Sequence, residues 1–279
     1  MPLAVAVVAL ALAPAGAHGA EARVAALQVG LRAQGLYAGT VDGLPGPATT
    51  AGVRRLQARA ALGVDGIAGP ATRRALGWRG RPVLGARAVL AGVRGWDVAA
   101  VQFLLARAGF PSGPTDGEAG PRFAAALRRY QAWAGLVADG VAGPQTVGRL
   151  RAAPPRPPLR LALPVRAPMG DGFGPRGNRF HSGVDFTAPT GAPVTAAGPG
   201  CVTFAGADAG YGRLVVVAHG AGVTTWYAHL SRIDAPRGRC LAAGAPLGTV
   251  GASGRATGPH LHFEVRVRDA ATDPRLALG

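Results

Sequence analysis

Lysine is absent from this 279-residue chain, and carboxylates are scarce. All 30 basic residues are therefore arginine, and with only 14 Asp and Glu residues the formal charge at pH 7 is +16. Such a charge indicates a polyanionic partner, or else a codon bias toward arginine. The sequence has no helix-turn-helix, no zinc finger and no stripe of aromatic and basic residues, so nucleic acid is not the expected partner.

Cysteine is nearly absent as well, since the chain has only Cys201 and Cys240. Neither lies in a C-x-x-C pair, which argues against a cysteine-based metal site. An even pair is typical of one disulfide in an exported protein, and two buried free thiols are the alternative. The chain also lacks H-E-x-x-H, which excludes the zinc peptidases that bind their metal on a helix.

No apolar run has the length and composition of a convincing membrane span. The apolar start, "MPLAVAVVALALAPAGAHGA", ends in small residues, and residues 15–17 fit the A-x-A cleavage pattern. Residues 1–17 are therefore predicted to be a secretory signal peptide. The start lacks the usual Lys or Arg, so an uncleaved anchor or a misplaced start codon is the alternative. Export would place the protein at the cell wall or in the periplasm, without stable membrane insertion, where anionic wall polymers or a membrane surface could attract its charge.

An internal repeat fills the first half of the chain. The segment that begins at Leu27 matches the segment that begins at Val101, at an ungapped offset of 74 residues. The matched residues include Gln28 with Gln102, Asp42-Gly43 with Asp116-Gly117, Gln57 with Gln131, and Asp65-Gly66 with Asp139-Gly140. After each Asp-Gly turn comes a Gly-Pro pair, and proline is favoured in the first turn of a helix. Each unit is therefore predicted to form three short helices, over residues 22–77 and 96–150.

This repeat resembles the peptidoglycan-binding module of bacterial wall hydrolases. The resemblance implies that both modules attach the protein to peptidoglycan. The second module has Arg122-Phe123 where the first has Ala48-Thr49, so the two are not expected to bind equally well. Residues 78–95 between the modules are interpreted as a linker, or as a short helix around residues 88–90. The Pro-rich residues 151–168 predict a stiff, extended linker that holds two domains apart.

The second half, residues 169–279, has the texture of an all-β domain. Short β-branched runs alternate with Gly, Pro, Asp and Asn, and no long helical period occurs. In an extended strand an even spacing places His181 and Asp185 on one face, and likewise His260 and His262. Leu261 and Phe263 would then point to the opposite face, toward a core.

These paired side chains favour a metal site. Two histidines and one aspartate would make the three-residue set of a catalytic zinc site, which leaves a fourth position for water. The histidines left over could transfer protons during hydrolysis. The residues alone leave open which histidine of the H-x-H pair holds the metal.

The motifs "HSGVDF", "WYAHL" and "GPHLHFEV", in this order and after "GFGPRG", resemble the signatures of lysostaphin/LytM-type zinc endopeptidases. The resemblance covers residues 170–268. It implies an antiparallel sheet of the LytM, duplicated-hybrid-motif type and cleavage of peptide bonds in peptidoglycan. The zinc ligands that it implies are His181, Asp185 and His262, with a water as the fourth, and the catalytic residues are His229 and His260.

The sequence therefore predicts a multidomain, secreted zinc endopeptidase that cuts peptide cross-links of peptidoglycan and is anchored by two modules. A non-catalytic, wall-binding activator of other hydrolases is the alternative. A cupin-like barrel is set aside, since no histidine follows His262. The bond that is cut, a D,D cross-link or a bridge peptide, stays open.

Several other polar and aromatic residues of the second half have simpler interpretations. His219 ends an apolar strand and is predicted to be structural. Glu264 is expected to hydrogen-bond a ligand imidazole, to face solvent or to form a salt bridge between strands. Trp226 and Tyr227 are expected to pack the sheet. Arg176 either steers a substrate carboxylate or is one of many surface arginines.

Overall fold

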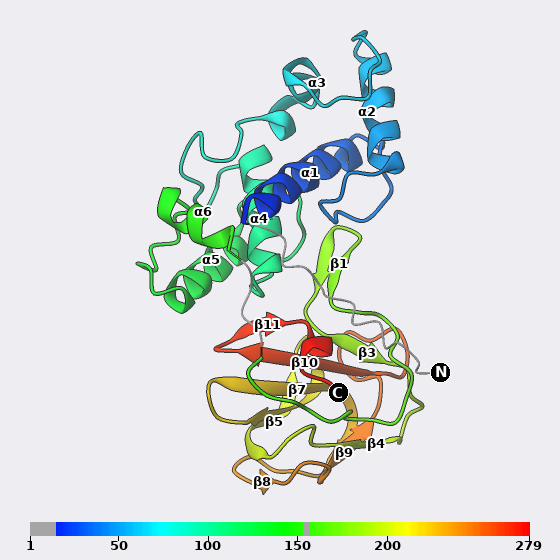
Figure 1. Cartoon of the computed structure of the whole chain (residues 1–279). Coiled ribbons are helices and arrows are strands. Elements are labelled where there is room, and N and C mark those ends of the chain that lie inside the picture. The colour runs from blue at the N-terminus through cyan, green and yellow to red at the C-terminus, as the bar shows by residue number, and fades with distance from the viewer. Residues whose placement is uncertain (1–14, 153–156) are drawn as a thin grey trace, which may run out of the picture.

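The computed structural model describes residues 15–152 and 157–279. Helices gather in the first half of the chain and strands in the second (Figure 1). The helices are α1 (Ala15–Ala33), α2 (Pro47–Arg59), α3 (Pro70–Ala75), η1 (Gly77–Gly80), α4 (Trp96–Arg107), α5 (Pro121–Trp133), α6 (Pro144–Leu150) and η2 (Pro274–Leu276). The strands are β1 (Gly174–Arg176), β2 (Arg179–His181), β3 (Val184–Phe186), β4 (Pro193–Thr195), β5 (Gly200–Asp208), β6 (Gly212–Ala218), β7 (Val223–Ile233), β8 (Cys240–Leu241), β9 (Pro246–Val250), β10 (Leu261–Val267) and β11 (Ala270–Thr272).

The two predicted three-helix modules are confirmed. Helices α1 to α3 form the first module and α4 to α6 the second, and α2, α3, α5 and α6 each begin at the proline of a Gly-Pro pair. Helix α1 packs against α4, so the two modules share one apolar core. Residues 1–14 of the predicted signal peptide lie outside the described residues. Within the described residues, no helix is long and apolar enough to span a membrane.

A glutamine holds each Asp-Gly turn of the modules in place. The Gln131 side chain, which is almost fully buried, donates to Asp139 Oδ1 at 2.8 Å and accepts from the Gly140 N–H at 2.9 Å. The same pair of bonds recurs at Gln28, Gln57 and Gln102. One amide thereby satisfies the carboxylate and the backbone donor of a tight turn, which explains why Gln and Asp-Gly repeat together.

The two predicted linkers are packed segments in the structure. Residues 88–90 are not helical: Val89 is fully buried and bridges to Ala142 as an isolated β-pair. In residues 157–168, the described part of the Pro-rich segment after residue 152, Leu161 and Val165 lie in the apolar core of the β domain, so this part packs on that domain. The modules also contact the β domain directly, and Trp133 Nε1–H donates to the Val267 carbonyl at 3.2 Å. Apolar burial of Leu161 and Val165 therefore holds this segment against the β domain.

The second half forms an antiparallel sheet of nine strands and a separate hairpin of β1 and β2. The order in the sheet is β11-β10-β7-β6-β5-β8, with β3 paired to β10 and β9 paired to β4 and β7. Leu261, Phe263 and Tyr227 are fully buried in its core, as expected from strand alternation. Figure 1 shows the β1 hairpin projecting from the sheet toward the helices.

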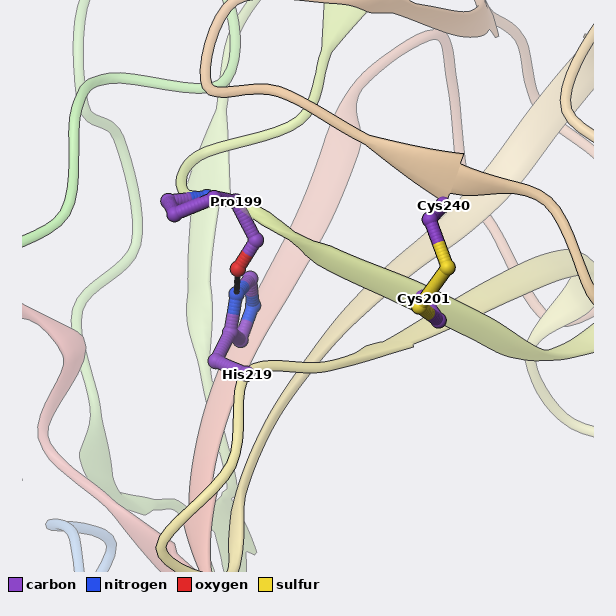
Figure 2. Close-up of a disulfide and its surroundings, with 4 residues drawn as sticks. All are labelled: Pro199, Cys201, His219 and Cys240. Atoms are coloured by element: carbon purple, nitrogen blue, oxygen red, sulfur yellow. Dashed lines mark hydrogen bonds between the residues drawn. A yellow bond between two sulfur atoms is a disulfide. The ribbon is translucent and has the colours of Figure 1, made fainter.

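A disulfide joins Cys201 in β5 to Cys240 in β8, two residues that are directly opposite in the sheet (Figure 2). It closes a loop between residues that are 39 positions apart. The bond ties the short edge strand β8 to the long strand β5. A crosslink across such a loop restricts the unfolded chain and thereby stabilises the fold.

We expect Gln131→Leu to lower the free energy of unfolding by about 1–3 kcal/mol, because it leaves the buried Gly140 N–H and the Asp139 carboxylate without their partner. Urea unfolding followed by circular dichroism measures the change. Gln145→Leu in the exposed part of α6 is the matched control and should stay within about 0.5 kcal/mol of wild type. Equal stability of the two variants would contradict the role of the glutamine.

Candidate active site

His181 and Asp185 meet at one point but do not share a strand, which corrects the expectation from their spacing. His181 ends β2 in the hairpin, whereas Asp185 lies in β3 of the large sheet. The two strands are separated by a bend at Gly183, where a Cβ would lie 2.3 Å from the Phe263 carbonyl oxygen. Glycine therefore lets β3 approach β10, and this close approach brings His181 Nε2 to 3.1 Å from Asp185 Oδ1.

His262 completes a triangle of ligand atoms with these two residues. Its Nδ1 lies 2.9 Å from Asp185 Oδ1 and 3.0 Å from His181 Nε2. Register explains the meeting, because His262 in β10 is paired directly with Asp185 in β3. Within the described residues these three form the cluster that could hold a metal ion.

The other ring nitrogen of each histidine lies within hydrogen-bond distance of an oxygen acceptor, so each neutral ring can present an unprotonated nitrogen to Asp185. His181 Nδ1–H donates to the Gly172 carbonyl at 2.8 Å. His262 Nε2–H donates to Glu264 Oε1 at 3.0 Å. In neutral rings, the lone pairs of His181 Nε2 and His262 Nδ1 therefore point at the same space as Asp185 Oδ1. Three lone pairs that converge within about 3 Å repel one another unless a cation lies between them, so the residues fit a metal ion.

The charges of the site give the same result. Burial opposes ionisation of Asp185, but the imidazoles of His181 and His262, which donate to the carboxylate when their facing nitrogens carry protons, outweigh it and lower the pKa of the carboxyl. For His262, burial disfavours the charged ring, yet the carboxylates of Asp185 and Glu264 raise its pKa to about 9. The carboxylates therefore favour a positive charge at this point, either as a proton or as a metal ion.

Glu264 is a fully buried partner of His262. Its Oε1 accepts from Ser182 Oγ at 2.6 Å, Tyr211 Oη at 2.8 Å and His262 Nε2. Its Oε2 accepts from Arg266 Nε at 2.7 Å. Burial opposes its ionisation, but the Arg266 charge and these donors lower the pKa of Glu264. The carboxylate is thus anionic and fixes which nitrogen of His262 faces the metal position.

His229 and His260 lie beside the triangle and face each other, with ring centroids 4.8 Å apart. His229 Nδ1–H donates to the Ser253 carbonyl at 2.7 Å, and His260 Nδ1–H donates to the Gly258 carbonyl at 2.9 Å. Each ring therefore keeps its Nε2 lone pair for chemistry. Burial lowers the pKa of His229, which keeps this ring neutral at neutral pH.

The backbone of His229 is unusual, because its φ of 61° lies in the left-handed region. Few non-glycine residues adopt this conformation, and those that do often lie at functional sites. The residue sits where the pairing of β7 with its neighbours shifts register. The irregularity turns the imidazole out of the regular sheet and toward His260.

A cavity of about 540 Å³ opens over these groups. All five predicted site residues line it: His181, Asp185, His229, His260 and His262. Sequence reasoning missed Ser182, Tyr211, Arg255 and Thr257, which line the same cavity; Ser182 lies inside the motif "HSGVDF", but no role was predicted for it. Tyr211 directly precedes β6, and it reaches the cavity only because β6 pairs within the sheet. No rule of sequence spacing predicts that position.

Arg176 and His219 have different positions relative to this cavity. Arg176 lines it and donates to Asp185 Oδ2 at 3.1 Å and to Asp171 at 2.9 Å. His219 lies outside the cavity, where Nδ1–H donates to the Pro199 carbonyl at 2.8 Å (Figure 2). Its Nε2 is 2.7 Å from Thr225 Oγ1, which is hydrogen-bonded to Tyr227 Oη. His219 is therefore a structural residue, as predicted.

Comparison with known proteins matches both halves of the chain. Residues 179–274 match the family model described as "Peptidase family M23". Residues 20–76 and 94–150 each match the model described as "Putative peptidoglycan binding domain".

Three relatives illustrate the extent of the similarity. The DD-carboxypeptidase/endopeptidase Mpg of Neisseria meningitidis is 45% identical over 96 residues, which are 34% of this chain and 22% of that protein. The peptidoglycan DD-endopeptidase ShyB of Vibrio cholerae is 41% identical over 93 residues, 33% of this chain and 22% of that protein. The crystallised catalytic domain of lysostaphin from Staphylococcus simulans is 34% identical, with a TM-score of 0.37, over 39% of this chain and 90% of that chain. The match thus spans about a fifth of the length of these two curated relatives.

We expect Glu264→Gln to lower the affinity for Zn²⁺ about 10- to 100-fold. All four groups around Glu264 donate, so one orientation of an amide turns its NH₂ toward Arg266 and the other turns it toward His262. Competition with a chromophoric chelator measures the affinity. Glu118→Gln on the exposed surface of a module is the control, and a Glu264 variant that binds zinc as this control does would refute the positioning role.

His219 should make folding stability depend on pH. Because burial lowers its pKa in the folded protein, the unfolded chain binds the proton first as the pH falls below about 6.5. Stability is therefore fully present above that pH and is lost below it. Between about pH 7.5 and pH 5, wild type should lose more unfolding free energy than His219→Gln in urea titrations. Equal losses in the two proteins would show that His219 does not contribute.

Proposed function

Since residues 179–274 form a peptidase domain of family M23 and two peptidoglycan-binding domains precede it, we propose that this protein is a zinc-dependent endopeptidase of the bacterial cell wall. It hydrolyses peptide cross-links of peptidoglycan, and the two modules hold it on that polymer. The names of its relatives, which include peptidoglycan DD-endopeptidases, support a D,D cross-link as the bond that is cut.

One observation carries the proposal. Three acceptor atoms from His181, Asp185 and His262 converge at the floor of a cavity, and two further histidines turn their free Nε2 atoms to the same cavity. A binding protein needs no such pair of proton carriers. The complete set of five residues therefore weighs against the non-catalytic activator.

Two imidazoles and one carboxylate are the ligand set that catalytic zinc sites use. When bound, zinc supplies a Lewis acid that polarises a carbonyl oxygen and makes water acidic near neutral pH. Asp185 and Glu264 supply negative charge around the position, and Glu264 holds the His262 ring in the tautomer that presents Nδ1.

His229 and His260 are the proposed proton carriers. Hydrolysis of an amide requires that a water lose a proton and that the leaving nitrogen gain one. Because both Nδ1 atoms are committed to backbone carbonyls, each Nε2 can accept a proton and release it again without turning the ring. The protonated ring also donates a hydrogen bond to negative charge that develops on the carbonyl oxygen.

The modules and the disulfide support an extracytoplasmic setting. Two peptidoglycan-binding domains imply peptidoglycan as the partner, and the excess of arginine favours anionic wall polymers as well. The disulfide between Cys201 and Cys240 is typical of an oxidising compartment. We therefore propose that the protein acts after export, at the cell wall or in the periplasm.

We expect His260→Ala to slow digestion of purified sacculi about 100-fold or more, because it removes one proton carrier. Zinc content should stay at the wild-type value, since His260 is not among the three ligand residues. Release of soluble fragments measures the rate, and their masses identify the bond.

His219→Gln replaces a histidine outside the cavity and is the matched control, with digestion expected at the wild-type rate. A His260→Ala protein that digests sacculi as fast as this control would remove His260 from the mechanism. Fragments cut elsewhere than at a D,D bond would correct the proposed substrate.

A further inference from the structure

The two modules hydrogen-bond to the turn of the β1–β2 hairpin through equivalent backbone N–H groups. The Val41 N–H donates to the Gly177 carbonyl at 2.8 Å, and the Thr115 N–H donates to the Asn178 carbonyl at 2.7 Å. Val41 and Thr115 are separated by 74 residues, which is the offset of the repeat. Each is the residue before an Asp-Gly turn, so the duplicated turn makes the same contact twice, on two successive carbonyls.

This hairpin carries His181, a proposed metal ligand. Its strands pair with each other and not with the nine-stranded sheet, and β2 ends on His181. An isolated two-stranded hairpin is only marginally stable in water. At its base Phe173 packs on Phe180, with ring centroids 5.0 Å apart. Contacts at the tip therefore add to the few that hold the position of His181.

A second contact joins the second module to the strand that carries His262. Gly109 accepts from the Ala271 N–H at 3.1 Å, and Trp133 Nε1–H donates to the Val267 carbonyl at 3.2 Å. Arg129 forms an ion pair with Asp269 at 3.1 Å. All three partners lie in β10, in β11 or in the turn between them. The modules thus contact the turn of the hairpin that carries His181 and the strand β10 that carries His262.

The docked modules leave the cavity open. Each residue that lines it lies between Gly170 and His262, so no residue of the described parts of the modules enters it. Docking in this arrangement therefore does not block substrate. The contacts of the docked modules are instead with the hairpin, with β10 and β11 and with the turn between these two strands, which form part of the frame of the site.

We infer that the two modules, besides binding the wall, dock together on the peptidase domain and position His181 and His262 for the metal ion. This inference rests on the proposed zinc site. Val41 and Thr115 act as positioning residues through the hairpin, and Gly109 and Trp133 act through β10 and β11. Loss of docking loosens the hairpin, and metal affinity falls because the ligand atoms are no longer held at the spacing that the ion requires.

The repeat provides a matched pair of variants. Gly109 and Gly35 are equivalent positions, and both have a positive φ, 89° and 71°. A Cβ at Gly109 would lie 2.3 Å from the Ala271 carbonyl oxygen, whereas a Cβ at Gly35 would meet no atom within 4 Å. Gly109→Ala and Gly35→Ala therefore introduce a similar backbone strain into a module, but only the first pushes against the peptidase domain.

The full-length proteins are compared by zinc affinity in chelator competition and by radius of gyration in small-angle X-ray scattering. We expect Gly109→Ala to bind zinc about tenfold more weakly than Gly35→Ala and to have a larger radius of gyration. Equal zinc affinities would overturn the inference. A larger radius of gyration with unchanged zinc affinity would also overturn it, because loss of docking would then have no effect on the metal site.

Trp133→Phe is a second variant, for the case that Gly109→Ala does not fold. It keeps an aromatic ring against Phe110 and Tyr130 and removes the donor to Val267. It should weaken zinc binding in the same direction, and unchanged zinc affinity would again overturn the inference. Failure of the proposed function is recognised separately, since wild type itself would then bind no zinc.

Discussion

The buried carboxylate of Glu264 is the interaction on which the rest of the site depends. Strand β10 is buried on both faces, with Phe263 and Val265 in the apolar core and Glu264 on the other side. A buried anion is tolerated only when donors surround it, and here they come from Ser182, Tyr211, His262 and Arg266. Ser182 and Tyr211 belong to other segments of the peptidase domain, whereas His262 and Arg266 lie in β10 itself. One charge therefore sets the tautomer of a ligand and holds those segments together.

The modules use a similar principle on a smaller scale. A buried glutamine satisfies each Asp-Gly turn, and the residue just before two of these turns donates its N–H to the hairpin of the peptidase domain. A rigid turn keeps such a donor in place. The element that is repeated for stability thus also provides a contact between domains, since both modules donate to consecutive carbonyls of a single hairpin.

Much of the architecture was predictable because it follows from local rules. Gly-Pro pairs start helices, strand alternation buries Leu261 and Phe263, and the repeat offset identifies two modules. The spacing argument placed His181 and Asp185 on one strand, whereas the chain turns between them at Gly183 and places them on different strands that meet at one point. The predicted spacing role of the Pro-rich segment did not foresee the packing of Leu161, because a Pro-rich composition reports the stiffness of a free chain and not the apolar burial of its side chains.

The amino-acid sequence by itself determined the elements, the duplicated modules and the residue types of a zinc site, because periodicity and motif order are local properties of the chain. Only the tertiary structure decided which atoms face one another. The pairing of β10 with β3 selects Nδ1 of His262, the buried Glu264 fixes its tautomer, and the left-handed backbone of His229 turns that ring toward His260. Such choices depend on register and burial between segments far apart in sequence, which no local pattern encodes.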